Sequence, residues 1–260
     1  MADAASFRRT DDGGVLTVTF TRDDKLNAVT PDMLDALRTA ADDLAEREDA
    51  RVLVITGEGR HFTAGMDITT LVAQGGGDGG VLRRSYRRLH LLFDELEAIE
   101  KPVVLAAQGP CRGFGVELAA SCDFRICSDR AVFGLPEIAN LAVLPGSGGI
   151  SRLTRLIGPH WTKWIAMAGQ EVDAAQALSI GLVHAVHADA GFPAAVDAFA
   201  RSLVALSGEA LGLAKLGIAA AASADRGSAR DFDRMANTLL LKTPEHLARI
   251  EAFGSRKPKR

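Results

Sequence analysis

The stretch of sequence that decides the fold is VVLAAQGPCRGFGVELA, which spans residues 103–119. Its first five residues, Val103 to Ala107, are all apolar, as expected of a strand buried on both faces of a sheet. A glycine-containing turn follows, and a predicted helix that carries Glu117 begins at Gly115. A buried strand, a turn and a helix in this order indicate a unit of an α/β fold.

The sequence on either side repeats this alternation of strands and helices. Thr30 and Pro31 fit the N-cap and the first position of a helix, and the apolar residues that follow keep a period of 3.6. The spacing of the elements predicts successive turns of one right-handed spiral. The predicted strands are residues 15–20, 52–55, 124–127 and 131–133, and the predicted helices are residues 31–48 and 81–99.

After about residue 190 the pattern changes to helices alone. We therefore expect two parts, an α/β core over residues 1–190 and a helical region over residues 191–260. The low-complexity segment Gly75–Gly80 is predicted to be a loop that either gates a pocket or is a plain linker. The four C-terminal helices are predicted at residues 192–206, 211–222, 229–241 and 244–253.

The composition and charge of the chain exclude several classes of protein. The chain has 260 residues, 47% of them apolar, and a net charge of −3, which argues against a nucleic-acid partner. The basic tail Arg256–Arg260 is either solvated or makes a local phosphate contact. No apolar run reaches the length of a membrane span, and the first ten residues do not resemble a signal peptide. We expect a soluble, cytoplasmic protein that contacts no membrane.

The three cysteines and six histidines show no metal-binding spacing. No C-x-x-C pair occurs, so the cysteines are expected to be small buried side chains in a reducing compartment. We predict no metal site and no separate cofactor. The Gly113-x-Gly115 pair is a poor match to a dinucleotide-binding fingerprint, which argues against a nucleotide-dependent dehydrogenase.

Two glutamates, Glu117 and Glu137, each close a small turn marked by glycine or proline. Upstream, FTAGMDI at residues 62–68 places Met66 between a strand and a predicted short helix, and Phe114 stands in the equivalent position before Glu117. Amides at helix N-termini lack intrahelical partners, so two of them can converge on a carbonyl oxygen. Two adjacent carboxyl groups, with pKa values raised in an apolar pocket, suit general acid–base chemistry next to that carbonyl.

Each of these residues also has a purely structural explanation. Glu117 can complement a helix dipole, Glu137 can be an exposed loop acid, and the glycines can serve turns alone. Asp67 is interpreted first as a residue that caps its turn. The order and spacing of the motifs, more than any one of them, favour a catalytic interpretation.

Taken together, the motifs resemble those of the crotonase superfamily, also called the enoyl-CoA hydratase/isomerase superfamily. The resemblance runs from about Val15 to Val186, with a weaker similarity at the C-terminus. The segments that carry it are 26–28 (LNA), 54–57 (VITG), 62–68 (FTAGMDI), 102–109 (PVVLAAQG), 113–119 (GFGVELA), 122–123 (CD), 133–137 (FGLPE), 145–149 (PGSGG) and 177–183 (ALSIGLV).

The resemblance implies a crotonase-like ββα spiral core that holds an acyl-CoA site and a C-terminal helical region for oligomerisation, in homotrimers or hexamers that are dimers of trimers. It implies an acyl-CoA thioester as the ligand, with coenzyme A as part of the substrate. The backbone amides of Met66 and Phe114 would hold the thioester oxygen. The residues it assigns to coenzyme A or substrate binding are Arg60, Ala64, Gly65, Asp67, Ile68, Phe253 and Arg256, the last two reaching a neighbouring subunit.

Glu117 and Glu137 match both catalytic glutamates of the hydratases. The resemblance therefore implies hydration of a 2-enoyl-CoA to a 3-hydroxyacyl-CoA, a step of the kind found in fatty acid metabolism. An enoyl-CoA isomerase, a hydrolase of acyl-CoA and a non-catalytic acyl-CoA-binding protein stay open as alternatives. Three departures bear on the substrate: Phe114 replaces a usual glycine, residues 138–144 are one residue longer, and Thr69 replaces a basic residue.

Overall fold

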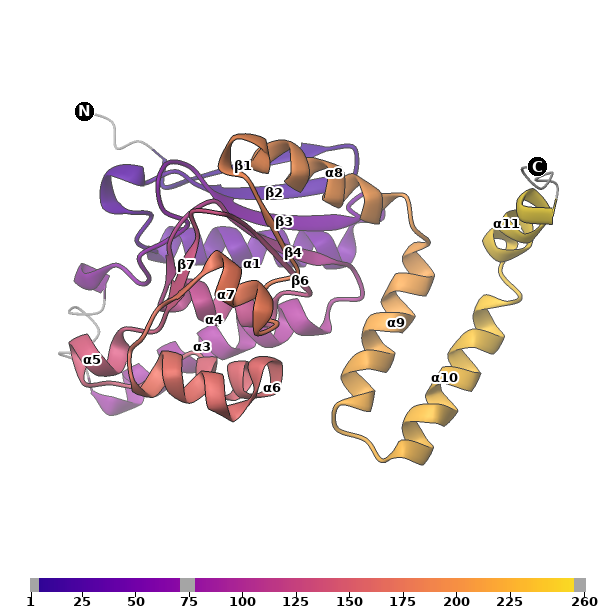
Figure 1. Cartoon of the computed structure of the whole chain (residues 1–260). Helices are drawn as coiled ribbons and strands as arrows, with labels where there is room; N and C mark the ends of the chain where they lie inside the picture. Colours follow the sequence, from indigo (N-terminus) through magenta and orange to yellow (C-terminus); the bar gives the residue numbers. More distant parts are fainter. Residues whose placement is uncertain (1–4, 71–77, 255–260) are drawn as a thin grey trace.

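The computed structural model describes residues 5–70 and 78–254 and has a six-stranded sheet at its centre (Figure 1). The sheet order is β1-β2-β3-β4-β6-β9, and every neighbouring pair is parallel except the antiparallel β1–β2 hairpin. The strands are β1 (Phe7–Asp12), β2 (Val15–Phe20), β3 (Val52–Gly57), β4 (Val103–Ala107), β6 (Phe124–Ser128) and β9 (Ala185–His187). All five residues of β4 are buried, as the apolar run predicted.

A smaller sheet lies beside the first and carries the turns of the site. Its order is β5-β7-β8, with β5 parallel to β7 and β8 antiparallel to β7. β5 is short because Gly109 and Pro110 precede it and Gly113 follows it. The strands of this sheet are β5 (Cys111–Arg112), β7 (Val132–Gly134) and β8 (Val172–Asp173).

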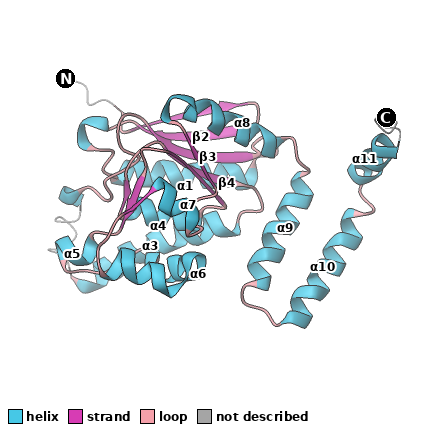
Figure 2. Cartoon of the chain, viewed as in Figure 1, coloured by secondary structure: helices cyan, strands magenta, loops and turns pink. Residues whose placement is uncertain are grey.

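Helices cover both faces of the six-stranded sheet, which explains why β4 is apolar throughout and β3 is apolar over its first four residues (Figure 2). The main core lies between the sheet and α1 (Pro31–Glu46), α3 (Gly79–Ala98) and α4 (Phe114–Ser121). On the opposite face α8 (Phe192–Val204) packs on β2, β3 and β6. Three further helices of the core are α5 (Glu137–Leu141), α6 (Gly149–Thr162) and α7 (Ala174–Ser179).

The last three helices extend away from the sheet, and α9 and α10 lie side by side (Figure 1). Lys215 anchors α9 to the core: its Nζ donates to Asp123 Oδ2 and to the carbonyl oxygen of Leu96, both at 2.8 Å. The three helices are α9 (Gly208–Ala221), α10 (Arg226–Leu240) and α11 (Pro244–Gly254). The division of the chain near residue 190 into a core and an oligomerisation region stays a prediction.

The predicted elements are present, with shifts of a few residues at their ends. α10 begins three residues earlier than expected because Asp225 caps it, accepting hydrogen bonds from the N–H groups of Gly227 and Ser228. β1 was not predicted, since its exposed, charged residues lack a strand pattern. The prediction of a loop over Gly75–Gly80 is wrong at its end, because Gly79 and Gly80 are the first residues of α3 and Asp78 caps this helix; residues 75–77 lie outside the described residues.

Over residues 5–70 and 78–254, no single helix is long and apolar enough to cross a membrane. One bent pair, residues 189–204 and 208–221, meets the length and composition test only when both are taken together, and the two helices are inclined at 98°.

Candidate active site

One cavity of about 780 Å³ brings together the residues that the sequence predicted for catalysis. Glu117 and Glu137 line it, and so do Met66 and Phe114. These four residues come from α4, the start of α5 and two glycine turns that are about fifty residues apart in the chain. The cavity is also lined by apolar side chains, among them Tyr86, Leu89, Leu141, Val143 and Leu144.

The backbone amide of Met66 is not used in the bridge that this residue forms with Val29. Val29 forms a parallel bridge with Met66, in which the Val29 N–H donates to Gly65 O at 2.8 Å and the Asp67 N–H donates to Val29 O at 2.9 Å. In such a bridge the central residue uses neither its own N–H nor its own carbonyl toward the partner. In the part of the chain that the structure describes, the Met66 N–H has no acceptor, so it can donate to a ligand in the cavity that Met66 lines.

The Phe114 amide is the first N–H of α4. The N–H groups of Val116 and Glu117 both bond to Gly113 O, but among the described residues the N–H of Phe114 has no acceptor. This is the expected state of a first-turn amide, which carries a partial positive charge. The positive φ of this turn falls on Gly113, at φ 53° and ψ −121°, so Phe114 replaces the usual glycine without left-handed strain.

The ring of Phe114 does not block the cavity. It is 2% exposed, and it packs on Phe93 in the core with 5.3 Å between the ring centroids. The two amide turns themselves are in contact, because a Cβ placed on Gly65 would lie 3.7 Å from the Phe114 nitrogen. Two unpartnered donors thus face one cavity from adjacent turns, as required to hold a single oxygen.

Glu117 is 3% exposed, and two backbone donors hold its carboxyl group. Its Oε1 accepts hydrogen bonds from the N–H groups of Ser147 at 2.8 Å and Gly149 at 3.0 Å. Burial raises the pKa of Glu117, while these two N–H groups and the nearby His90 act in the opposite direction. The donors stabilise the ionised form, which is the form that a general base requires.

Glu137 has a different environment. Its Oε2 is buried, and no hydrogen-bond partner is found for it in the described part of the chain. Burial, with a smaller contribution from the charge of Glu117, raises the pKa of Glu137 to about 7. Burial raises the pKa of both carboxyl groups, but only Glu117 has backbone donors that oppose the rise. Glu137 is therefore the one better suited to carry a proton, and Glu117 the one better suited to accept one.

The close approach of Gly113 to the Glu137 carboxyl predicts the effect of a substitution at Gly113. A Cβ at Gly113 would lie 2.8 Å from Glu137 Oε1, and only glycine adopts its backbone angles readily. We expect Gly113→Ala to lower the free energy of unfolding by about 1–3 kcal/mol and to displace the Glu137 carboxyl. Thermal unfolding and kcat measure the two effects. Gly191→Ala is the control, since a Cβ there meets nothing within 4 Å; equal effects in both variants would contradict the prediction.

The residues predicted to bind coenzyme A fall into two groups. Ala64, Gly65, Asp67 and Ile68 line the cavity. Asp67 also has the structural role expected of it, because its carboxylate accepts hydrogen bonds from the Thr69 N–H at 2.9 Å and from Arg22 at 3.1 Å.

The other predicted contacts lie away from the cavity of this chain. Arg60 is exposed and does not line the cavity; its N–H donates to Asp23 and its carbonyl accepts from Arg130. Phe253 is 74% exposed on α11, and Arg256 lies outside the described residues.

Sequence reasoning missed two basic residues at the cavity, Arg22 and Lys25. They precede the Leu26-Asn27-Ala28 motif and lie on or next to a short 3-10 helix, Asp23–Lys25. The motif itself was recognised, and its basic flank was the available signal. No cluster of three or more metal-ligating side chains occurs in residues 5–70 and 78–254.

Comparison with known proteins agrees with this geometry. Residues 10–255 match the family described as enoyl-CoA hydratase/isomerase. A probable mitochondrial enoyl-CoA hydratase 2 of Arabidopsis thaliana is 32% identical over 95% of this chain and 81% of its own length. A short-chain-enoyl-CoA hydratase of Clostridium acetobutylicum is 32% identical over 93% of this chain and 92% of its own. The crystal structure of an enoyl-CoA hydratase from Bacillus anthracis superposes with a TM-score of 0.89 at 26% identity, covering 98% of both chains.

The fold, the paired amide turns and the two glutamates define a crotonase-type enzyme. The chain belongs to the enoyl-CoA hydratase/isomerase family.

Proposed function

We propose that this enzyme adds water across the 2,3 double bond of a 2-enoyl-CoA to give a 3-hydroxyacyl-CoA. The observation that carries the proposal is the pair of glutamates with opposed environments beside two unpartnered amides. The ionised Glu117 takes a proton from water as the oxygen attacks C3. The protonated Glu137 delivers a proton to C2.

The amides of Met66 and Phe114 act on the charge that develops between these steps. Attack at C3 moves electrons toward the thioester carbonyl, which gains enolate character. Two donors aimed at that oxygen stabilise the transition state more than the substrate; removing one donor of this kind typically costs about 3–4 kcal/mol of barrier. We propose that no separate cofactor takes part, because the two acids and the two amides account for every proton and charge in the reaction.

Arg22 and Lys25 extend the proposal to the nucleotide part of coenzyme A. Both basic side chains line the cavity, as do Ala64 and Thr69. Thr69, which replaces a basic residue, is neutral and cannot supply that charge itself. The two basic charges suit the phosphates of coenzyme A, and Arg22 is already held in place by its pair with Asp67 and by the carbonyl oxygen of Ala28 at 2.6 Å.

The test is to incubate the protein separately with 2-enoyl-CoA and 3-enoyl-CoA thioesters of several chain lengths and to identify the products by mass spectrometry. Hydration adds the mass of one water and incorporates heavy oxygen from labelled water. An isomerase would move the double bond without a change in mass, and a hydrolase would release free coenzyme A. Either of those products in place of the hydrated thioester would contradict the proposal.

We also propose that the chain assembles into homotrimers or hexamers in the cytoplasm. The C-terminal helices carry large apolar side chains that the single chain leaves exposed, which is typical of a subunit interface. Phe253 and Arg256 would then reach the coenzyme A site of a neighbouring subunit. The exposed side chains include Ile218 at 73%, Met235 at 64%, Leu239 at 65%, Ile250 at 57% and Phe253 at 74%.

The assembly is testable by light scattering coupled to size-exclusion chromatography. We expect a mass of three or six times the 27.5 kDa of one chain. Met235 and Leu239 lie four residues apart on α10 and so share one face. The double variant Met235→Asp, Leu239→Asp is expected to shift the mass toward one chain. A wild-type protein that elutes as a monomer at micromolar concentration would contradict the proposal.

A further inference from the structure

One peptide group stands directly behind Glu117. The N–H of Ser147 donates to Glu117 Oε1 at 2.8 Å, and the carbonyl oxygen of Gly146 lies 2.9 Å from Nε2 of His90. These two polar groups belong to the same peptide unit, which is planar and trans, so they point to opposite sides of it. A tilt of the carbonyl therefore turns the N–H that holds Glu117.

The role of His90 in this contact follows from hydrogen-bond chemistry. The carbonyl oxygen of Gly146 only accepts, so Nε2 of His90 carries the hydrogen and donates. The ring also packs against the turn, because a Cβ on Gly148 would lie 3.5 Å from His90 Cε1. His90 lies on α3, one turn of helix after the cavity residue Tyr86. Its position fixes the turn from the side opposite Glu117.

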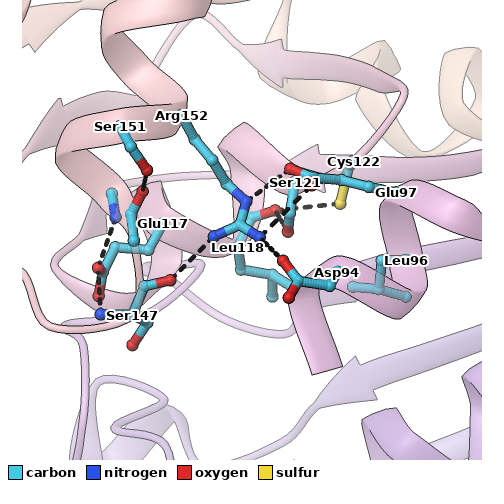
Figure 3. A network of polar contacts seen from close by, with 12 residues as sticks. Asp94, Leu96, Glu97, Glu117, Leu118, Ser121, Cys122, Ser147, Ser151 and Arg152 are labelled. Atoms are coloured by element: carbon cyan, nitrogen blue, oxygen red, sulfur yellow. Dashed lines mark hydrogen bonds and ion pairs between the residues drawn. The ribbon is translucent and has the colours of Figure 1, made fainter. Parts of the chain in front are cut away.

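Arg152 holds the next carbonyl of the same turn. Its Nη1 donates to Ser147 O at 3.0 Å, and its side chain, on α6, is 5% exposed. Asp94 and Glu97 on α3 each hold the guanidinium at 2.5 Å (Figure 3). These bonds tie α6 to α3, so the turn that carries the donors of Glu117 is fixed between the two helices.

We propose that His90 is a positioning residue for Glu117, which it aligns through the peptide group between Gly146 and Ser147. Arg152 supports the same turn from α6. The proposal deepens the proposed function and rests on it for the role of Glu117. It concerns no contact with the substrate, because His90 acts only through a hydrogen bond to the backbone.

Substitutions at His90 separate this role from simple packing. His90→Gln places an amide donor near the position of Nε2 and keeps the hydrogen bond to Gly146. His90→Leu keeps much of the volume and removes the donor. His160→Leu is the matched control, since His160 is an exposed histidine at the far end of α6.

We expect His90→Leu to lower kcat for crotonyl-CoA by roughly tenfold to a hundredfold, the loss typical of a misplaced catalytic group. KM is expected to stay within about twofold, because the binding contacts are untouched. His90→Gln is expected to recover most of the rate, and His160→Leu to match the wild type. Thermal unfolding of all three variants identifies any loss that comes from misfolding.

A second measurement is independent of turnover. Carbon-13 NMR of the glutamate carboxyl groups, with Glu117 assigned by its absence in Glu117→Gln, follows the titration of that residue directly. His90→Leu is expected to raise the pKa of Glu117, because the Ser147 N–H no longer points at the carboxylate. His90→Gln keeps the hydrogen bond but has no imidazole ring that could carry a charge. If the Glu117 pKa in this variant is near that of the wild type, the change seen in His90→Leu comes from loss of the hydrogen bond.

The two readouts distinguish the two proposals. If the wild type hydrates no enoyl-CoA, the proposed function fails, and the NMR titration still tests the link between His90 and Glu117. A folded His90→Leu with wild-type kcat and an unchanged Glu117 titration would overturn the inference. A rate loss in His90→Leu that His90→Gln does not recover would also overturn it, because packing alone would then explain the effect.

Discussion

Glu117→Gln is expected to lower kcat for hydration of crotonyl-CoA by about 10²- to 10⁴-fold, the contribution typical of a general base. Glutamine has the same shape, and its amide oxygen can still accept from the Ser147 and Gly149 N–H groups that hold Glu117 Oε1. The turn therefore keeps its structure while the proton acceptor is lost. Steady-state kinetics over a range of substrate concentrations measures the effect, with KM expected to change little.

The control for this variant is Glu95→Gln, a neutralised glutamate on the exposed face of α3. It is expected to retain wild-type kinetics. The Glu117 variant should also keep its thermal unfolding temperature within a few degrees of the wild type, because the variant loses no buried contact. Turnover by Glu117→Gln close to that of Glu95→Gln would remove Glu117 from the mechanism.

Glu137→Gln is expected to cause a loss of similar size for the opposite reason. Its carboxyl group must carry the proton that is delivered to C2, and an amide cannot transfer one. Burial raises the pKa of Glu137 to about 7, so the wild-type kcat is expected to decrease as the pH rises through about 7 and this proton is lost. At the acidic end the rate decreases again as Glu117 becomes protonated, which gives a bell-shaped profile.

The same raised pKa has a consequence for stability. The folded protein holds the Glu137 proton more tightly than the unfolded chain, whose carboxyl pKa is near 4.5. Binding of this proton stabilises the folded protein to its full extent below pH 4.5, and the stabilisation is lost as the pH rises through about 7. Glu137→Gln removes that dependence, so its free energy of unfolding is expected to decrease less between pH 5 and 8 than that of the wild type. Parallel pH dependences for the two proteins would contradict the assignment.

Much of the fold followed from local sequence patterns. The short apolar run of β4 is typical of a buried strand, and the Thr30–Pro31 start of α1 has the residue types of a helix N-terminus. Thr30 Oγ1 nevertheless bonds Asp32 and makes no capping bond to the backbone. β1 was missed because its own residues have no strand pattern. It is an edge strand, and its pairing with β2 holds it in the extended conformation.

The candidate site was predictable only in part. Glu117, Glu137 and the two glycine turns stand out in the chain because each lies in a short motif. Their contacts with the groups that tune them do not stand out. The donors of Glu117 lie 30 and 32 positions further on, in the 145–149 motif, whose link to Glu117 the sequence does not show, and His90 and Arg152 act on the backbone of that turn. Such support depends on where helices cross in space, and nothing in the local sequence marks it.

A crystal structure with acetoacetyl-CoA, a thioester that lacks the 2,3 double bond, tests the central claim most directly. The amides of Met66 and Phe114 are predicted to donate to the thioester oxygen at about 3 Å, with C2 and C3 lying between the carboxyl groups of Glu117 and Glu137. A thioester bound with its oxygen away from both amides, or with either glutamate turned out of the cavity, would contradict the account.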